Sequence, residues 1–461
     1  MKNNNGYILL LLGGLVLGIT AGRLGIEYAF LLGGIALFPL CLALKPELGL
    51  YFLAAYSVVD YALRAVTVGG GIIGSLWHEL FFVAIVLMYL VHLVISSRGF
   101  KYRLTSLDMP IFIFAGVSIF LLLVNSPELL VAVEGLRVVV QYLLWYFVVV
   151  NIVRDKLTVK RVLNVLVIIT AGIALHGIYQ YIVGVEIPTT WYDSSAETYI
   201  TSRVFSIIGS PNILGSMMVL TSPVTFSLAL NEKRLPKKMI YLGMLLAMLL
   251  CLVFTLSRGA WLAFGLTVLI YAFMKDRRLV IPAAVAGLIL LAAVPQIGER
   301  IAYMLSPQYM ASSAVGGRIA RWTLSIEAIK TSPIFGVGLG QFGGATAMRH
   351  VPDAFYADNF YLKTFAEMGL VGFTAFIYLL YRSCIDSLRE IRKTADVEFY
   401  NIGMGIFAGA VGILAHNAVE NVFEVPMMTS YYWMMIALII SFKFIGVTGT
   451  DDSEEAAQNH D

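Results

Sequence analysis

Apolar stretches of about 20 residues follow one another along most of the chain, each bounded by charged or turn-forming residues. A run of that length, coiled as an α-helix, crosses the roughly 30 Å hydrocarbon core of a bilayer. The pattern predicts about 12–14 membrane-spanning helices, because several of fourteen candidate runs are short or closely joined. The candidate spans are 7–22, 26–44, 48–66, 80–96, 109–125, 133–153, 162–183, 211–230, 239–256, 259–274, 279–294, 359–381, 399–417 and 425–447.

The apolar runs are continuous, which decides between the two membrane architectures. Residues 279–294 are apolar at nearly every position, whereas a transmembrane β-barrel shows stretches of about 10 residues that alternate apolar and polar. The composition agrees, because 59% of the residues are hydrophobic and only 13% are charged, about half the charged fraction of a soluble domain. We expect an all-α, polytopic transmembrane helical bundle.

Positively charged residues mark one side of this bundle. They gather in every second loop, near residues 98–103, 154–161, 233–238, 275–278 and 382–393. With Lys2, Lys45 and Lys443, these loops hold 21 of the 32 Lys and Arg residues. Short loops rich in Lys and Arg stay in the cytoplasm, so the pattern predicts cytoplasmic termini and outward-facing loops at the other end of the helices.

Two outward loops are longer than a tight connection, one at residues 184–210 and one at residues 295–357. Loops of such length are usually functional or disordered. Ile319, Trp322, Ile326 and Ile329 are spaced as on one face of a helix, so residues 317–331 should form an amphipathic helix within the second loop. The expected parts of the chain are N-terminal helices at 1–200, middle helices at 201–294, the long loop at 295–357, C-terminal helices at 358–447 and a disordered tail at 448–461.

Arginines are unusually frequent on the predicted outer side, against the positive-inside bias. They include Arg203, Arg258, Arg300, Arg318, Arg321 and Arg349. The planar guanidinium suits phosphate oxygens and is weakly hydrated, so the set suggests an anionic ligand such as a lipid-linked diphosphate. The alternative is that each arginine pairs with one of the outer carboxylates.

Two charged residues stand at predicted helix boundaries. Arg258 lies between two apolar runs with no loop to solvate it, and a charge in that position is costly unless it lines a cavity. Asp358 comes just before an apolar run, where its carboxylate meets the membrane boundary. Asp358 is also a good N-cap, so capping alone would explain it, although capping and catalysis do not exclude each other.

Other polar residues carry weaker signals. His416 opens a polar segment that continues through Glu424 and could bind sugar hydroxyls or hydrate a turn, and His350 in the long loop is a candidate base. The segment from Gly336 to Gly340 has the glycines of a phosphate-binding loop, but it follows a helix, which argues against a nucleotide site. The three cysteines have no metal-ligand spacing, so no metal is expected.

Three blocks of the sequence, together with a supporting block at Arg203 and Ser210-Pro211-Asn212, resemble the O-antigen ligase and polymerase superfamily of integral membrane glycosyltransferases. The three blocks are Thr255 to Trp261; Gly317 to Trp322, continuing through Ser332 to Gly340; and Asp358 to Leu362, with Glu367, Gly369 and Gly372 after it. Their order and spacing, between about residues 200 and 430, carry the resemblance. The first 200 residues match only as a number of helices.

The resemblance implies a GT-C-like bundle in the cytoplasmic (inner) membrane that transfers a glycan from an undecaprenyl-diphosphate carrier on the outer face. The reaction would be inverting and would need neither metal nor cofactor, and no nucleic acid partner is expected. Arg258 and Arg318 would bind the diphosphate and stabilise the leaving group, and Asp358 would take the proton of the acceptor hydroxyl. Further contacts to the diphosphate or glycan would come from Arg203, Arg321, Asn212, Asn359, His350 and His416.

Members of this family are polymerases or ligases, and the two activities differ in the acceptor that receives the glycan. Ligases usually carry a histidine where this chain has Asp358, eleven residues before Gly369, and aspartate there favours a polymerase that joins polysaccharide repeat units. Transfer to a lipid core or a protein, by a ligase, is the alternative, and His350 could replace Asp358 as the base. A transporter or flippase of lipid-linked glycan would favour inverted repeats and midplane charges, and no internal repeat is evident.

Overall fold

The computed structural model describes residues 22, 45–66, 77, 81, 102–186, 188, 203–282, 284–285, 288 and 295–448. Within these ranges all regular elements are helices, and one isolated β-bridge joins Thr394 to Thr448. The predicted all-α class is therefore confirmed. The predicted spans 7–22, 26–44, 80–96 and 279–294 lie largely or wholly outside the described residues, as does the tail from 449.

The chain divides into two compact units, Met1–Tyr102 and Arg103–Asp461. In the described part of the first unit, the predicted span 48–66 forms two helices, α3 (Glu47–Ala54) and α4 (Tyr56–Val66). Asp60 accepts hydrogen bonds from the Arg64 Nε at 3.0 Å and from the Trp77 Nε1 at 2.9 Å. The charge of Arg64, which lies within the predicted span 48–66, is thus paired one helical turn away.

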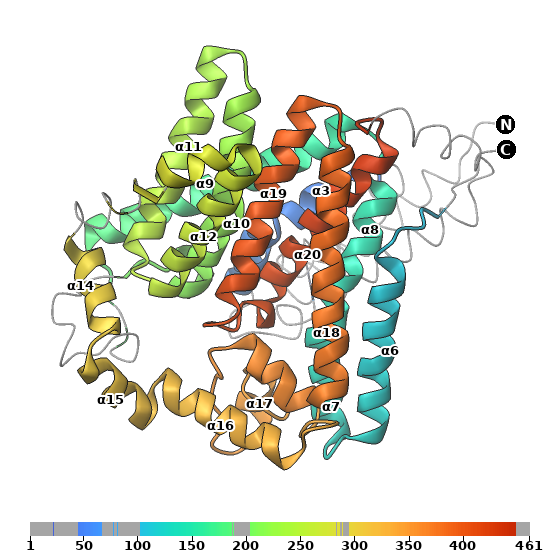
Figure 1. Ribbon diagram of the computed structural model, residues 1–461, viewed down its shortest axis with the longest axis vertical. Helices are drawn as coiled ribbons and strands as arrows, with labels where there is room; N and C mark the ends of the chain where they lie inside the picture. The colour runs from blue at the N-terminus through green and yellow to red at the C-terminus, as the bar shows by residue number, and fades with distance from the viewer. Residues whose placement is uncertain are drawn as a thin grey trace. The chain divides into compact units, whose positions relative to one another are not determined.

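Seven helices of the described residues, all in the second unit, are long and apolar enough to cross a membrane. They are Leu129–Ile152, which joins α7 (Leu129–Leu136) to α8 (Trp145–Ile152), then α9 (Lys156–Val183), α10 (Pro211–Asn231), α11 (Leu235–Phe254), α18 (Phe360–Lys393), α19 (Val397–His416) and Pro426–Phe444, which contains α20 (Pro426–Ile440). Two further apolar helices, α6 (Asp108–Val124) and α12 (Arg258–Lys275), complete the bundle in Figure 1. This is a polytopic helical membrane protein.

The largest difference from the predicted bounds is the length of α18, which was expected to end at residue 381. The helix continues to Lys393 because its last turns are amphipathic and internally paired. The buried Asp386 carboxylate lies 2.9 Å from the Arg382 Nη2 and 3.2 Å from the Arg389 Nη1. Pairs at three- and four-residue spacing stabilise a helix, so the basic residues that marked a loop instead extend the helix.

The centre of the bundle is formed by α10, α19 and α20, whose side chains are buried almost throughout. Small residues allow α19 to approach its neighbours closely. A Cβ added at Gly409 would lie 2.4 Å from the Leu220 backbone oxygen of α10, and one at Gly412 would lie 2.1 Å from the Thr267 hydroxyl of α12. The glycines of α19 therefore fix the spacing of three helices that lead to the same end of the bundle.

Basic residues from separate loops meet at one end of the bundle. Lys156 and Lys160, in the first turns of α9, lie 2.8 Å from Asp396 and 2.7 Å from Glu398, which flank the start of α19. At the same end Lys275 closes α12 and donates to Asn401 at 2.8 Å. Three loops predicted to be cytoplasmic are thus neighbours in space, at the top of Figure 1.

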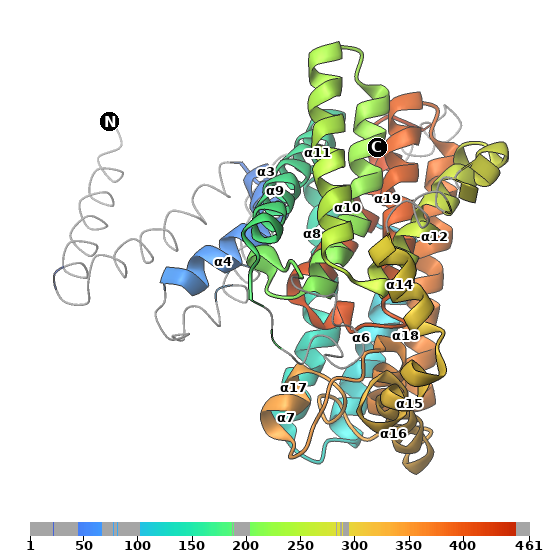
Figure 2. The ribbon, with the colours of Figure 1, turned by 90° about the vertical axis from the view of Figure 1, so that its left-hand side faces the viewer.

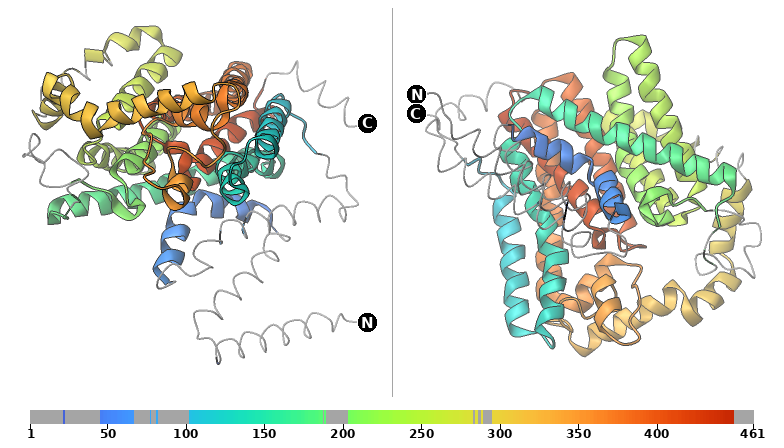
Figure 3. Two further views of the ribbon diagram at one scale, coloured as in Figure 1. Left: turned by 90° about the horizontal axis from the view of Figure 1, so that it is seen from below. Right: turned by 180° about the vertical axis from the view of Figure 1, so that it is seen from behind.

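The long loop at 295–357 is largely helical. It contains α14 (Pro295–Met304), α15 (Pro307–Gly316), α16 (Arg318–Thr331) and α17 (Ala345–His350). The predicted amphipathic helix at 317–331 corresponds to α16. Figure 2 shows α14 to α16 following one side of the bundle downwards, and the left view of Figure 3 shows α16 lying across the end opposite the basic loops.

A break in α18 joins this loop to the bundle. Gly369 has φ 60° and ψ −167°, a conformation that only glycine adopts without strain, so the helical ladder is interrupted there. The loop supplies the missing partners: the Val337 and Gly338 N–H groups donate to Ala366 and Glu367, while Leu370 and Val371 donate to Pro333 and Ile334, at 2.8–3.2 Å. Residues 333–338 thus serve as a backbone clamp on α18.

Candidate functional site

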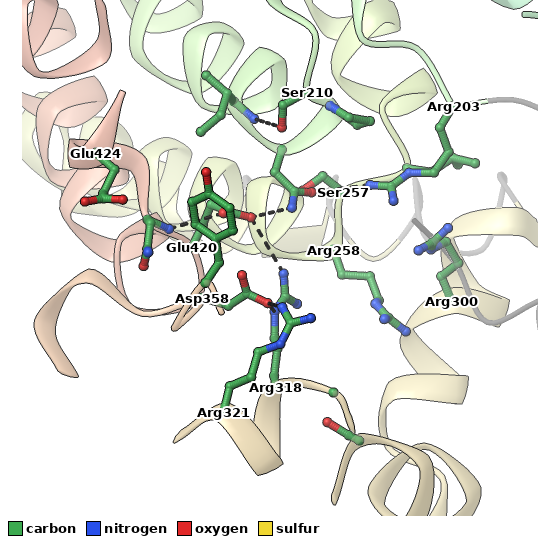
Figure 4. A pocket seen from close by; sticks show the side chains of 18 of the residues that line it. Arg203, Ser210, Ser257, Arg258, Arg300, Arg318, Arg321, Asp358, Glu420 and Glu424 are labelled. Carbon is green, nitrogen blue, oxygen red and sulfur yellow. Dashed lines mark hydrogen bonds and ion pairs between the residues drawn. The ribbon is translucent and has the colours of Figure 1, made fainter. Parts of the chain in front are cut away.

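A cavity of about 790 Å³ opens at the end of the bundle away from the basic loops. Its walls come from segments far apart in sequence: the stretch 203–213, the α11–α12 turn, α14 to α16, residues 356–358 and the segment 420–425. Five arginines and three carboxylates are among its lining residues, and they converge in Figure 4. They are Arg203, Arg258, Arg300, Arg318, Arg321, Asp358, Glu420 and Glu424.

Arg203 is held at the cavity wall by its surroundings. Its Nε donates to the Thr255 backbone oxygen at 3.1 Å, and its Nη2 donates to the Asn212 Oδ1 at 3.3 Å. Asn212 itself is positioned by a helix start, because Ser210 caps α10 and Pro211 occupies its first turn. The Ser-Pro-Asn block therefore fixes an amide beside a buried arginine.

Arg258 owes its position to a strained turn between α11 and α12. Leu256 has φ 51°, which is rare for a residue with a Cβ, and this kink lets Ser257 cap the N-terminus of α12. Arg258 is the first residue of α12. Its guanidinium carbon lies 5.0 Å from the ring centre of Tyr309 and 5.8 Å from that of Tyr303, both on the long-loop helices. These cation–π contacts hold the charge against the wall of the cavity.

Arg300 adds a third guanidinium to this side. It lies on α14, is 3% exposed and lines the cavity. Sequence reasoning counted Arg300 among the outer arginines but assigned it no role, because it belongs to none of the recognisable blocks. Three arginines from three separate elements thus face one space, an arrangement that suits an anion with several oxygens.

The other side of the cavity mixes arginines with carboxylates. Arg321 Nη1 donates to Asp358 Oδ2 at 2.6 Å, and Trp322 Nε1 donates to the Asp358 backbone oxygen at 3.3 Å. Arg318 lies between two acids, with its Nε 3.9 Å from Asp358 Oδ2 and its Nη2 3.9 Å from Glu420 Oε2. Asp358 has φ 49°, a left-handed conformation that aspartate tolerates better than most residues.

Glu420 is a cavity-lining carboxylate within the polar segment that begins at His416, and no catalytic role is predicted for it from the sequence. Its Oε2 accepts a hydrogen bond from the Asn212 side-chain amide, and its Oε1 accepts one from the Asn421 backbone N–H at 3.2 Å. Burial and the nearby Asp358 carboxylate raise its pKa above the ordinary glutamate value, although Arg318 opposes the shift. No periodic pattern marks residues 417–425, so only coordinates could single it out.

A buried ionic cluster supports the acidic side of the cavity. Lys363 Nζ lies 2.7 Å from Glu367 Oε2 and 3.1 Å from Glu424 Oε1, and all three side chains are at most 4% exposed. Glu424 also accepts the Ala345 backbone N–H at 2.6 Å, and Glu367 accepts that of Phe342 at 3.2 Å. The cluster therefore ties the first turns of α18 to the segment before α17.

Six of the nine predicted site residues line the cavity: Arg203, Asn212, Arg258, Arg318, Arg321 and Asp358. Three do not. Asn359 caps α18 through Leu362 N–H, and His416 is buried behind the wall, 2.8 Å from Ser216 Oγ. His350, the alternative base, ends α17 on the outside, 3.3 Å from Glu134 Oε1.

Together the fold and the cavity define a class: a multi-pass membrane protein with an arginine-rich pocket at one end of its helices. Residues 243–377 match the sequence model of the family described as O-antigen ligase. This match supports the resemblance of the chain to the O-antigen ligase/polymerase superfamily and a membrane enzyme of that type. A search of curated proteins gives no match.

The matched stretch covers only part of the pocket. It includes the α11–α12 turn with Arg258, the long loop with Arg318 and Arg321, and Asp358 at the start of α18. Arg203, Asn212 and the segment from Glu420 to Glu424 lie outside it. The pocket thus combines residues of the matched stretch with residues that precede it and follow it in the sequence.

Proposed function

We propose that this protein transfers a polyprenyl-diphosphate-linked glycan to the hydroxyl of an acceptor sugar, and so polymerises repeat units of a surface polysaccharide. The observation that carries the proposal is the convergence of Arg203, Arg258, Arg300, Arg318 and Arg321 on one cavity. A diphosphate leaving group gains negative charge as its bond to the sugar breaks. Preorganised guanidinium groups stabilise such charge best in the transition state.

In the proposed reaction the acceptor oxygen attacks the anomeric carbon from the face opposite the diphosphate, which inverts the configuration. Arg258 and Arg318 hold the departing diphosphate, and Arg203, Arg300 and Arg321 complete its surroundings. The proton of the acceptor hydroxyl passes to a carboxylate of the pocket, either Asp358 or Glu420. A volume of about 790 Å³ is in the range of pockets that enclose a small ligand.

We place the pocket on the outer face of the cytoplasmic membrane. The basic loops that meet at Lys156, Lys160 and Lys275 lie at the opposite end of the bundle, and such loops remain cytoplasmic. The cytoplasmic sides of α10 and α12 are then their C-terminal ends, and the pocket is formed at their N-termini. Both termini of the chain are proposed to be cytoplasmic.

Incubation of the purified protein with lipid-linked oligosaccharide extracted from the source cells tests the proposal. We expect a ladder of longer lipid-linked glycans on a gel. Arg258→Ala and Arg318→Ala should each slow formation of the ladder about 10²–10³-fold, the cost of losing one donor to a developing oxyanion. Arg349→Ala is the matched control, because Arg349 is an exposed arginine outside the pocket that contacts Glu134 at 2.7 Å.

The same assay separates the alternative activities. A single shifted product on an added lipid core or protein, without a ladder, would identify a ligase. Movement of the lipid-linked glycan across a vesicle membrane without any new glycosidic bond would identify a transporter. Ladders of equal intensity from the wild-type protein and both arginine variants would refute the proposed site.

A further inference from the structure

Glu420 is a carboxylate on the wall of the cavity, beside one of the arginines proposed to hold the diphosphate. It lies in the short segment between α19 and the C-terminal span, and it meets Asn212 from α10 and Arg318 from α16. Its side chain is 14% exposed and lines the cavity. Figure 4 shows its carboxylate between Asp358 and the Ser257 region, facing the arginines.

The two carboxylates beside Arg318 differ in what binds them. Asp358 Oδ2 is held by the Arg321 guanidinium at 2.6 Å, a charge-assisted bond that occupies the oxygen and stabilises its negative charge. Glu420 accepts hydrogen bonds from two neutral amides, the Asn212 side chain and the Asn421 N–H. Its one charged neighbour among the ion pairs of the described residues is Arg318, at 3.9 Å. Among the hydrogen bonds of the described residues, Glu420 therefore accepts none from a guanidinium.

The surroundings of Glu420 act on its pKa in opposite directions, with a net increase. Burial and the Asp358 carboxylate raise the pKa of Glu420, and Arg318 only partly compensates. Glu424 and Tyr356 line the same cavity and add a second carboxylate and a phenol to its surroundings. A general base is most effective when its pKa lies close to the working pH, so an environment that raises a glutamate pKa favours this role.

We propose that Glu420 is the general base of the transfer, and that Asp358 is a positioning residue that holds Arg321 and Arg318 at the pocket. The inference rests on the proposed function. The acceptor oxygen forms its bond to the anomeric carbon while its proton moves to Glu420. The bond between that carbon and the diphosphate oxygen breaks, and the diphosphate leaves with the electron pair. The protonated Glu420 then returns its proton to water.

Variants at the two acids test the assignment. Each purified protein is assayed for polymer formation from pH 4.5 to 8.5 and for its Kd toward undecaprenyl diphosphate, a probe that lacks the glycan. We expect Glu420→Gln to lose about 10²–10⁴-fold in kcat, the usual contribution of a general base, and to keep its Kd within about threefold. Its residual activity should no longer fall toward acidic pH. Glu420→Asp should restore part of the rate together with the acidic limb.

Asp358→Asn should give the opposite pattern, because its role is to hold the arginines. We expect a weaker Kd for undecaprenyl diphosphate and an acidic limb that persists but moves to lower pH, because the Asp358 carboxylate no longer raises the pKa of Glu420. Glu398→Gln is the matched control, since Glu398 is a paired carboxylate at the other end of the bundle. Thermal unfolding of every variant shows whether it is folded.

The outcomes separate the inference from the proposed function. Two results with an active wild-type protein would overturn the assignment of the base alone. In the first, the Glu420→Gln variant keeps its rate and its acidic limb. In the second, the Asp358→Asn variant loses the acidic limb while its Kd is unchanged. A Glu420→Gln protein that loses Kd in proportion to rate would show a binding role and would also overturn it. A wild-type protein that binds undecaprenyl diphosphate but forms no product would refute both the function and the base.

Discussion

Arg321 Nη1 lies 2.6 Å from Asp358 Oδ2, and this bond joins the first turn of α16 to the residue that precedes the cap of α18. The long loop and the bundle are thus connected across the pocket by a charged side-chain contact as well as by the clamp at Gly369. Arg318, one turn of α16 earlier, depends on the same helix orientation. The contact therefore helps to fix the positions of the Arg318 and Arg321 guanidinium groups in the pocket.

A double-mutant cycle should detect this dependence. We expect Arg321→Ala and Asp358→Asn each to weaken binding of undecaprenyl diphosphate, and the double variant to lose less than the sum. Residues in one ion-pair network typically show a coupling energy of about 0.5–3 kcal/mol. Strictly additive losses in Kd would mean that Asp358 does not act through Arg321. Asparagine suits position 358 because it tolerates the positive φ there.

A lysine at position 258 should not restore the function of Arg258. The Arg258 guanidinium carbon lies 5.0 Å from the Tyr309 ring centre, and the side chain lines the cavity. An ammonium has neither the planar face nor the several N–H donors of a guanidinium. We expect Arg258→Lys to recover less than a tenth of the polymerisation rate that Arg258→Ala loses. Circular dichroism shows whether each variant is folded, and initial rates of polymer formation measure the loss of activity. Full recovery by lysine would reduce the role of Arg258 to a point charge.

Removal of Lys363 should destabilise the protein strongly. The Lys363→Met variant leaves the Glu367 and Glu424 carboxylates buried without their cation, and loss of one partner from a buried pair costs about 3–5 kcal/mol. The midpoint of thermal unfolding in detergent should fall accordingly. The double variant Lys363→Met with Glu367→Gln should regain part of the stability, since it removes one of the uncompensated charges. No recovery would mean that packing dominates the cluster.

An alanine at position 369 should separate the loop from α18. A Cβ there would lie 2.3 Å from the Ile334 backbone oxygen, and the backbone conformation costs about 1–3 kcal/mol for any other residue. We expect Gly369→Ala to lower the unfolding midpoint and to increase proteolysis within residues 332–345. Gly372→Ala is not a clean control, because its Cβ would meet Met368. Gly243, where a Cβ meets nothing within 4 Å, is suitable.

Stability should depend on pH through Glu420. Because its pKa in the folded protein is raised above 4.5, the native state binds the proton more tightly than the unfolded chain. The free energy of unfolding therefore decreases as pH rises through that window and stays lower at neutral pH. Glu420→Gln should raise the unfolding midpoint at pH 7.5, and the difference from wild type should shrink toward pH 4.5. A lower midpoint at pH 7.5 would contradict the shift.

Much of the fold could be predicted because the bilayer imposes length and composition on each spanning helix. The runs at 211–230 and 239–256 became α10 and α11 within a few residues. The end of α18 was missed because the charges of its last turns pair along the helix, which a hydropathy pattern interprets as a loop. The break at Gly369 was missed as well, since a single glycine in an apolar run gives no sign that another segment pairs with the backbone.

Prediction of the site residues relied on short blocks of recognisable sequence more than on hydrophobic periodicity. Arg258, Arg318 and Asp358 stand at helix starts that recognisable blocks mark, and the structure brings them to one cavity. Glu420 and Arg300 escaped because their importance arises only from tertiary contacts: Glu420 meets a residue 208 positions away in the chain. The capping role considered for Asp358 falls instead to Asn359, whose side chain accepts the Leu362 N–H.

The backbone clamp on α18 affects which parts of the sequence of this protein can vary in evolution. Four backbone hydrogen bonds and a few glycines hold residues 333–338 against the helix, and none of those bonds depends on which side chains the loop displays. Substitutions in α14 to α16, which line the pocket, can accumulate while the docking of the loop on α18 persists. The shape of the pocket can therefore diverge between related proteins without redesign of the spanning scaffold.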